Sequence, residues 1–335
     1  MTKIPILNRY FKIFINYLLG PVLFVWISIS LYNQIQQQPD LPLAWQQMKD
    51  GITGQNAWML LLVVVLMPVN WAIETFKWYV LVNRFQKLSF FKCYEAILSG
   101  VSLAMNTPNR IGEYGGRVLY LEPSFRMRGV ALTILCSVSQ LFVTLVLGFM
   151  SLVVLKPHLE AVHFAGTGLS EVLVNILFWG VLVMSILTGL FYFRMQWLVK
   201  LLKWIPYIKE KFSFAFVLEH LKGKLMLQIL GLSFLRFIVF AVQYVLLWQA
   251  LQVEIGWWQG FWSIALVFLI MAIVPSFAIA DVGIRGKVAL GIAGLFSTNS
   301  VAIFAGTVGI WLLNLVLPAL IGSLFLLTIK IFKER

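Results

Sequence analysis

The chain has 335 residues, of which 61% are hydrophobic and only 12% are charged, and its 26 Lys and Arg residues outnumber its 13 Asp and Glu residues. A soluble domain contains about 25% charged residues, and a globule of this length has too little interior for so many apolar side chains. A nucleic-acid-binding protein would gather its basic residues on a solvated face, for which this chain has too few polar residues. The composition therefore predicts an all-α polytopic integral membrane protein with no nucleic-acid partner.

Metal and cofactor chemistry find little support in the sequence. Cys93 and Cys136 are the only cysteines, and their spacing fits neither a disulfide framework nor a cysteine metal site. The three histidines add no ligand cluster, and no nucleotide-binding loop of the form G-x-x-x-x-G-K-[ST] occurs. We therefore expect no metal and no cofactor.

Six apolar runs are long enough to cross a bilayer, which takes about 20 residues. The first run follows three basic residues, as in a signal peptide, but its apolar stretch is longer than a typical signal-peptide core. We therefore interpret it as a retained span. The apolar runs of the six predicted spans are Ile13–Pro39, Gly51–Ile73, Gly129–Leu155, Val172–Phe193, Leu225–Ala250 and Val301–Ile329, and the second span is expected to descend past its run to Arg84.

The distribution of Lys and Arg predicts how two further apolar segments enter the membrane. If both were full spans, Arg126, Arg128 and the basic C-terminal tail would lie outside, against the positive-inside rule. Two oppositely inserted re-entrant helical hairpins, at about 90–126 from the cytoplasm and about 258–298 from outside, place 18 of the 26 basic residues and both termini in the cytoplasm. The segment at about 195–224 alternates Trp and Leu with Lys and is predicted to be an interfacial amphipathic helix. We treat 1–335 as one membrane domain.

The tips of the two hairpins carry the same short motif. The pattern acid-x-Gly-x-Arg occurs at 113–117 and again at 281–285, at a constant offset of 168, with a proline upstream of each. Two similar hairpins of opposite entry are typical of an inverted-topology repeat, which places a substrate site near the membrane midplane; chance similarity of two short strings is the alternative. The helix is expected to break over Asn106–Arg117. The predicted backbone and gating residues are Pro108, Gly112, Gly115, Gly116, Pro275 and Gly283.

The tips also concentrate positive charge at membrane depth. Irregular backbone there must line protein or a water-filled cavity, and the planar guanidinium of arginine binds phosphate through paired hydrogen bonds. Five cations face two acids, which favours an anionic ligand. The alternative is internal ion pairing, with Arg117 paired to either acid and Arg285 to the other. The predicted substrate-binding residues are Asn109, Arg110, Glu113, Arg117, Arg236, Asp281, Arg285 and Lys287.

Asn109 and the pair of Glu74 and Lys77 each allow a structural interpretation. Asn109 follows a proline at the broken tip, where its amide either contacts the head group or caps the helix. Glu74 and Lys77 lie three residues apart on the second span and are predicted to form a self-neutralising structural pair.

At these tips the sequence resembles the membrane region of lysylphosphatidylglycerol synthases, which is the flippase half of the multiple-peptide-resistance factor, and its stand-alone flippase-like relatives. The family elements Pro-x-Arg-x-Gly-Glu-x-x-x-Arg and Pro…Gly-x-Gly-x-Arg are similar to 108–117 and 275–285 here, although Ala280-Asp281 stands where relatives often have Gly-Gly. The chain stops at Arg335 with no aminoacyl-transferase domain, so we do not expect synthase activity. The resemblance implies movement of a lipid between leaflets.

The sequence alone thus favours a lipid flippase whose cationic midplane cavity accepts an anionic, otherwise charged or sugar-bearing head group. Its expected partner is a membrane phospholipid, aminoacyl lipid or polyprenyl-phosphate lipid, and its expected location is the bacterial inner membrane. A membrane glycosyltransferase or other lipid-modifying enzyme is the first alternative, with Glu113 and Asp281 as its only candidate acids. A non-transporting partner of a lipid synthase is the second, and a homo-oligomer is compatible with each.

Overall fold

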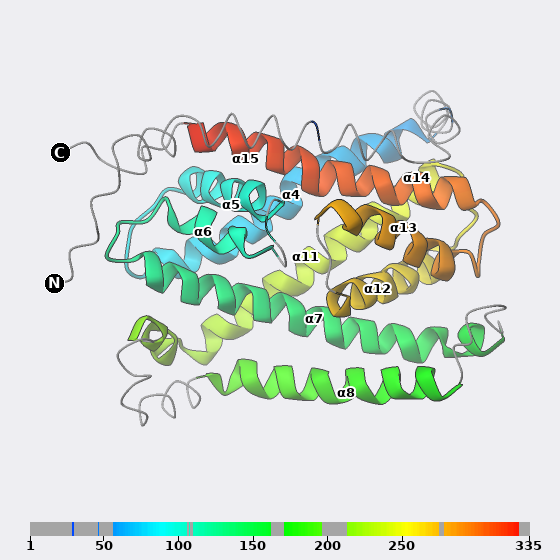
Figure 1. Ribbon diagram of the computed structural model, residues 1–335, viewed down its shortest axis with the longest axis horizontal. Coiled ribbons are helices and arrows are strands. Elements are labelled where there is room, and N and C mark those ends of the chain that lie inside the picture. The colour runs from blue at the N-terminus through cyan, green and yellow to red at the C-terminus, as the bar shows by residue number, and fades with distance from the viewer. Residues whose placement is uncertain are drawn as a thin grey trace.

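The computed structural model describes residues 29, 46, 56–105, 107, 110–161, 171–195, 213–274 and 278–327. Within these residues every regular element is a helix (Figure 1). The longest helices run along the length of the molecule, three of them nearly parallel and two obliquely, and the last of them is continuous through a π-helical turn. They are α4 (Ala57–Val82), α7 (Arg126–Ala161), α8 (Glu171–Phe193), α11 (Gly223–Ala250) and the run α14 (Ser300–Trp311), η4 (Leu312–Val316) and α15 (Leu317–Leu327).

Five of the described helical segments are long and apolar enough to span a membrane, and they correspond to the last five predicted spans. Helix α4 continues past the charge-free run that ends at Ile73 and reaches Val82, with Glu74 and Lys77 buried inside it, so both residues lie on the second span as predicted. The predicted first span, Ile13–Pro39, lies outside the described residues. On α8, Ile176 and Trp179 are each more than 60% exposed, an arrangement that suits hydrocarbon rather than water. The protein is a multi-pass membrane protein.

Two pairs of shorter helices fill the space between the long ones. The first pair is α5 (Phe90–Met105) with α6 (Gly112–Val118), and the second is α12 (Trp257–Ile273) with α13 (Ala278–Ala293). Figure 1 shows the pairs in opposite halves of the molecule, with the break of each pair directed toward the centre. The first pair packs against α4, α7 and α15, and the second against α7, α11 and α14. The helices of the pairs are shorter than the long ones, with 16 and 7 residues in the first pair and 17 and 16 in the second.

The break in the first pair is shorter than predicted. The helix resumes at Gly112, so all three predicted gating glycines of this tip are helical. The Thr107 hydroxyl closes the turn, since it accepts a hydrogen bond from the Gly112 amide at 2.7 Å and lies 3.3 Å from the Leu103 carbonyl oxygen. Arg110 adopts a left-handed backbone (φ 59°), which is uncommon outside glycine. The expectation of a break through Arg117 was wrong, because the helix resumes at Gly112, whose amide donates a hydrogen bond to the Thr107 hydroxyl.

The glycines of this tip serve close packing rather than irregular backbone. A side-chain carbon on Gly112 would lie 2.2 Å from the Leu103 carbonyl oxygen, and one on Gly116 would lie 2.5 Å from the Gly100 Cα. Gly115, by contrast, has open space beside it. Two of the three glycines therefore let α6 lie directly against α5.

The second break is also short in sequence. Helix α12 ends at Ile273 and α13 begins at Ala278, so the second acid-x-Gly-x-Arg motif is helical like the first. The turn between α13 and α14 covers 294–299, where the sequence predicts the chain to reverse. The Asn299 side chain caps α14 by accepting a hydrogen bond from the Ala302 amide at 3.1 Å.

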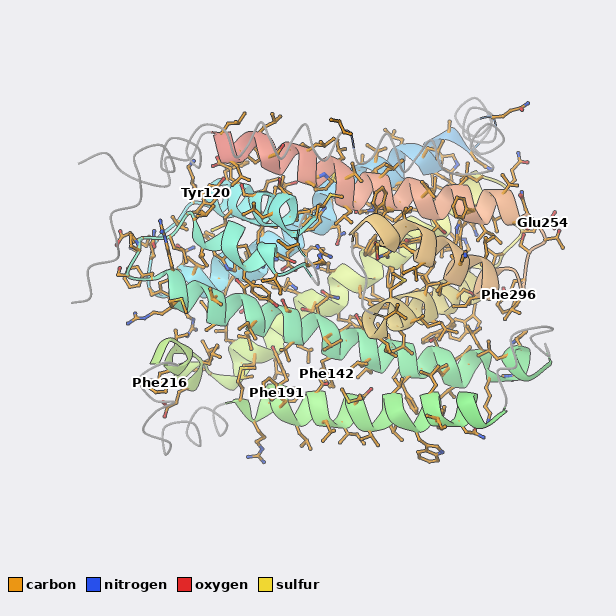
Figure 2. The ribbon with its side chains drawn as sticks, viewed as in Figure 1. Tyr120, Phe142, Phe191, Phe216, Glu254 and Phe296 are labelled. Atoms are coloured by element: carbon orange, nitrogen blue, oxygen red, sulfur yellow. The ribbon has the colours of Figure 1, made fainter. Side chains whose placement is uncertain are left out.

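The connections between helices gather at two opposite ends of the molecule. Figure 2 shows Tyr120 and Phe216 toward one end and Glu254 and Phe296 toward the other. Between the ends, Phe142 joins α7 to α8 by stacking on Tyr192, with 6.5 Å between ring centroids. Most of the predicted interfacial segment 195–224 lies outside the described residues; its described part includes the short 3-10 helix η3 (Ser213–His220).

Candidate functional site

A cavity of about 200 Å³ lies where the two broken tips meet the long helices. Three of its lining residues, Asn70, Arg236 and Asn314, stand near the midpoints of α4, α11 and the α14–α15 run respectively. The cavity therefore lies halfway along the spans, as the repeat argument predicts. Its described lining residues are Asn70, Trp71, Ala104, Met105, Thr107, Arg110, Arg236, Phe240, Tyr244, Met271, Asp281, Arg285, Trp311, Asn314 and Leu315.

Three arginines and one acid supply the charge of this lining. Arg110 comes from the first tip, Arg285 from the second and Arg236 from α11, and Asp281 is the acid. Arg285 donates to Asp281 at 3.0 Å, and the Tyr244 side chain lies beside the Arg285 guanidinium. Among the described lining residues the formal charge is therefore positive by two.

Arg117 is buried behind the cavity rather than in its wall. It is 1% exposed and pairs with Glu113, four residues earlier on α6. Arg285 pairs with Asp281 at the same four-residue spacing on α13. Each motif arginine therefore pairs with the acid of its own motif, which is one of the two ion-pair arrangements that the sequence allows.

Glu74 is the centre of a buried ionic cluster, which the sequence analysis missed. Its carboxylate lies 2.6 Å from the Lys77 Nζ, 2.9 Å from an Arg117 nitrogen and 3.2 Å from an Arg236 nitrogen. The predicted self-neutralising pair of Glu74 and Lys77 exists, but it is part of a network that joins α4, α6 and α11. The reason is that α6 delivers Arg117 to the α4 face that carries Glu74, which no spacing within α4 indicates.

Arg236 connects this buried cluster to the cavity. Its guanidinium pairs with Glu74 on one side and lies over the Trp71 ring, 5.0 Å from the ring centroid. Its side chain is 18% exposed and lines the cavity. Trp71 in turn donates from its indole nitrogen to the Asn314 backbone oxygen at 3.2 Å.

Of the remaining predicted residues, two lie outside the cavity wall and three lie outside the described residues. Lys287 is exposed and does not line the cavity, because two helical residues turn it about 200° away from Arg285. Its predicted place beside the arginines was therefore wrong. Glu113 lies beside the cavity rather than in its wall, 3.7 Å from Arg110. Pro108, Asn109 and Pro275 lie outside the described residues.

The structure also brings together polar and aromatic residues that the sequence analysis did not select. Asn70 and Asn314 are buried, and the Asn70 amide donates to the Asn314 side-chain oxygen at 3.3 Å. Four aromatic side chains complete the wall. A lone amide in the middle of an apolar span was a usable signal, since such groups are costly in hydrocarbon unless they are paired or functional. The aromatic residues are Trp71, Phe240, Tyr244 and Trp311.

The charge surplus at membrane depth persists when the whole described cluster is counted. With Lys287 left out and Glu74 and Lys77 added, five cations face three acids; the cations are Lys77, Arg110, Arg117, Arg236 and Arg285, and the acids are Glu74, Glu113 and Asp281. The part of the chain that the structure describes contains no group of three or more His, Cys, Asp or Glu residues that could hold a metal ion.

Comparison with known proteins identifies the family. The family model described as "Lysylphosphatidylglycerol synthase TM region" matches residues 40–322, which include both tips and every described residue of the cavity. A comparison with curated proteins finds no match. The family assignment indicates a membrane function related to lipids. The chain belongs to the lysylphosphatidylglycerol synthase transmembrane-region family.

Proposed function

We propose that this protein is a flippase that moves a lipid with an anionic head group between the two leaflets. The observation that carries the proposal is the midplane cavity, whose described lining holds Arg110, Arg236 and Arg285 against a single acid, Asp281. Arginine binds phosphate through paired, charge-assisted hydrogen bonds. The head group would occupy this cavity while the acyl chains stay in the bilayer.

The two helix pairs act in this proposal as re-entrant hairpins that enter from opposite faces. The end of the molecule where α4 ends and α7 begins carries many basic residues. The opposite end has fewer basic residues in its described connections, and we assign it to the outside by the positive-inside rule. The basic residues of the first end include Arg84, Lys87, Lys92, Arg126, Arg128, Lys222 and Lys224.

The ionic pairing favours transport over enzymatic catalysis. A lipid-modifying enzyme would need an acid free to exchange protons or to hold a metal. Glu74, Glu113 and Asp281 each accept a hydrogen bond or ion pair from an arginine. The transferase and synthase-partner alternatives predict product formation or a stable complex; our proposal predicts lipid movement by the purified chain alone.

Neutralising two cavity arginines is expected to slow transport. In proteoliposomes, we expect an Arg110→Gln, Arg285→Gln variant to move an acyl-labelled anionic lipid at least about tenfold more slowly, because each lost charge-assisted hydrogen bond contributes about 1.5–3 kcal/mol. Arg128→Gln is the matched control, since Arg128 is exposed and lies outside the cavity. Equal rates for the three proteins, each eluting as a folded species, would remove the proposal.

Cysteine labelling tests which end of the molecule faces the cytoplasm and which faces the outside. We expect a cysteine at Ser124, in the α6–α7 connection, to be protected from an impermeant maleimide in intact cells, and one at Thr298, in the α13–α14 turn, to react. Both positions are exposed, and the native Cys93 and Cys136 are buried, which limits background labelling. The reverse pattern would show that the protein has the opposite orientation. Equal labelling of both positions would contradict opposite entry of the hairpins.

A further inference from the structure

The cavity has a polar region that carries no charge, separate from its arginines. Asn70 is 1% exposed and Asn314 is 4% exposed, and they contact each other by one hydrogen bond of 3.3 Å. That bond leaves the Asn70 Oδ1 and the Asn314 Nδ2 without a partner among the described residues. An unpaired buried polar group costs about 1–3 kcal/mol. Both residues line the cavity, so two buried polar atoms without a described partner belong to its wall.

The local backbone holds this pair in place. Asn314 lies in the π-helical turn η4, a feature that occurs often at functional sites. Its backbone oxygen accepts the Trp71 indole hydrogen bond, and the Trp71 ring also carries the Arg236 guanidinium. The indole nitrogen of Trp311, another lining residue, is likewise buried and unpartnered among the described residues. The amide pair and the arginines are thus adjacent parts of one wall.

We infer that Asn70 and Asn314 form a neutral subsite for a hydroxyl-bearing head group, next to an arginine subsite for its phosphate. The inference rests on the proposed function and specifies its substrate class: a phosphodiester lipid capped by glycerol or a sugar. A hydroxyl group both donates and accepts hydrogen bonds, which matches one free amide oxygen and one free amide nitrogen. An ammonium group only donates, and the positive surplus of the lining opposes it.

The test compares lipids that differ only in the head group. Acyl-labelled phosphatidylglycerol and phosphatidylmethanol have the same charge, but only the first carries free hydroxyls. In proteoliposomes we expect the wild-type protein to move phosphatidylglycerol about tenfold faster, the effect of one to three net hydrogen bonds. Lysylphosphatidylglycerol, whose head group is cationic, is expected to move more slowly than phosphatidylglycerol. Equal wild-type rates for the first two lipids, or a faster rate for the third, would overturn the inference.

An Asn70→Leu, Asn314→Leu variant assigns the selectivity to this pair. Both residues are replaced together so that neither amide is left unpaired. We expect the variant to lose the preference for phosphatidylglycerol over phosphatidylmethanol, so that the ratio of the two rates falls to about one. A variant that slows both lipids equally would show a structural role only and would overturn the inference. Absence of movement of every lipid by the wild-type protein would instead remove the proposed function, and the lipid comparison needs no variant to decide this.

Discussion

Replacing Glu74 with alanine is expected to destabilise the protein by about 3–5 kcal/mol, the typical cost of removing one partner from a buried ionic cluster. Glu74 is 3% exposed and lies within 3.2 Å of nitrogens from Lys77, Arg117 and Arg236. Without it, Arg117 keeps only Glu113 among its described acidic partners. The variant therefore leaves positive charge uncompensated beside the buried Lys77 and Arg117.

The measurement is thermal unfolding in detergent, followed by tryptophan fluorescence, which is strong in a chain with 13 tryptophans. Glu95→Ala is the matched control, because Glu95 also pairs with a lysine three residues away but that lysine is 55% exposed. Exposed pairs contribute about 0–1 kcal/mol. If the two variants unfold at the same temperature, the Glu74 cluster has no special stabilising role.

Much of the architecture could be predicted from the sequence because its determinants are local. The length of the apolar runs predicts the spans, and the described helices α8 and α11 begin and end within two residues of the predicted bounds, while α7 extends six residues further at its end. The short length of α5 could also be predicted from the sequence, since Pro108 follows soon after Met105. The extent of the first break could not be predicted, because it depends on the Thr107 hydroxyl reaching across the turn to the Gly112 amide.

The site was predictable only in part, for a related reason. The two motif arginines could be recognised by their repetition, but their partners depend on which helix faces which. Arg117 lies against Glu74 of another helix, while Lys287, only two residues from Arg285, faces away from the cavity. The asparagine pair joins residues 244 positions apart. Contacts of this range follow from tertiary packing, which no spacing along the chain encodes.

Close packing of α6 against α5 requires glycine at position 116. A methyl group there would lie 2.5 Å from the Gly100 Cα and 2.7 Å from the Ser99 carbonyl oxygen, both of them backbone atoms that cannot rotate away. Helix α6 must then move off α5, at a cost of about 1–3 kcal/mol or more for overpacking. The movement also displaces Arg117, one residue further along, from Glu74. We therefore expect Gly116→Ala to lower both the unfolding temperature and the rate of lipid movement.

Gly115→Ala is the matched control, because it makes the same change in the same helix where nothing lies within 4 Å. Alanine favours a helix over glycine by about 1 kcal/mol, so we expect this control to be as stable as the wild-type protein or slightly more so. Gly100→Ala should fall between the two, since its added carbon would lie 3.0 Å from the Glu113 carbonyl oxygen. An equal unfolding temperature for Gly116→Ala and Gly115→Ala would mean that α6 does not pack against α5 at this glycine contact.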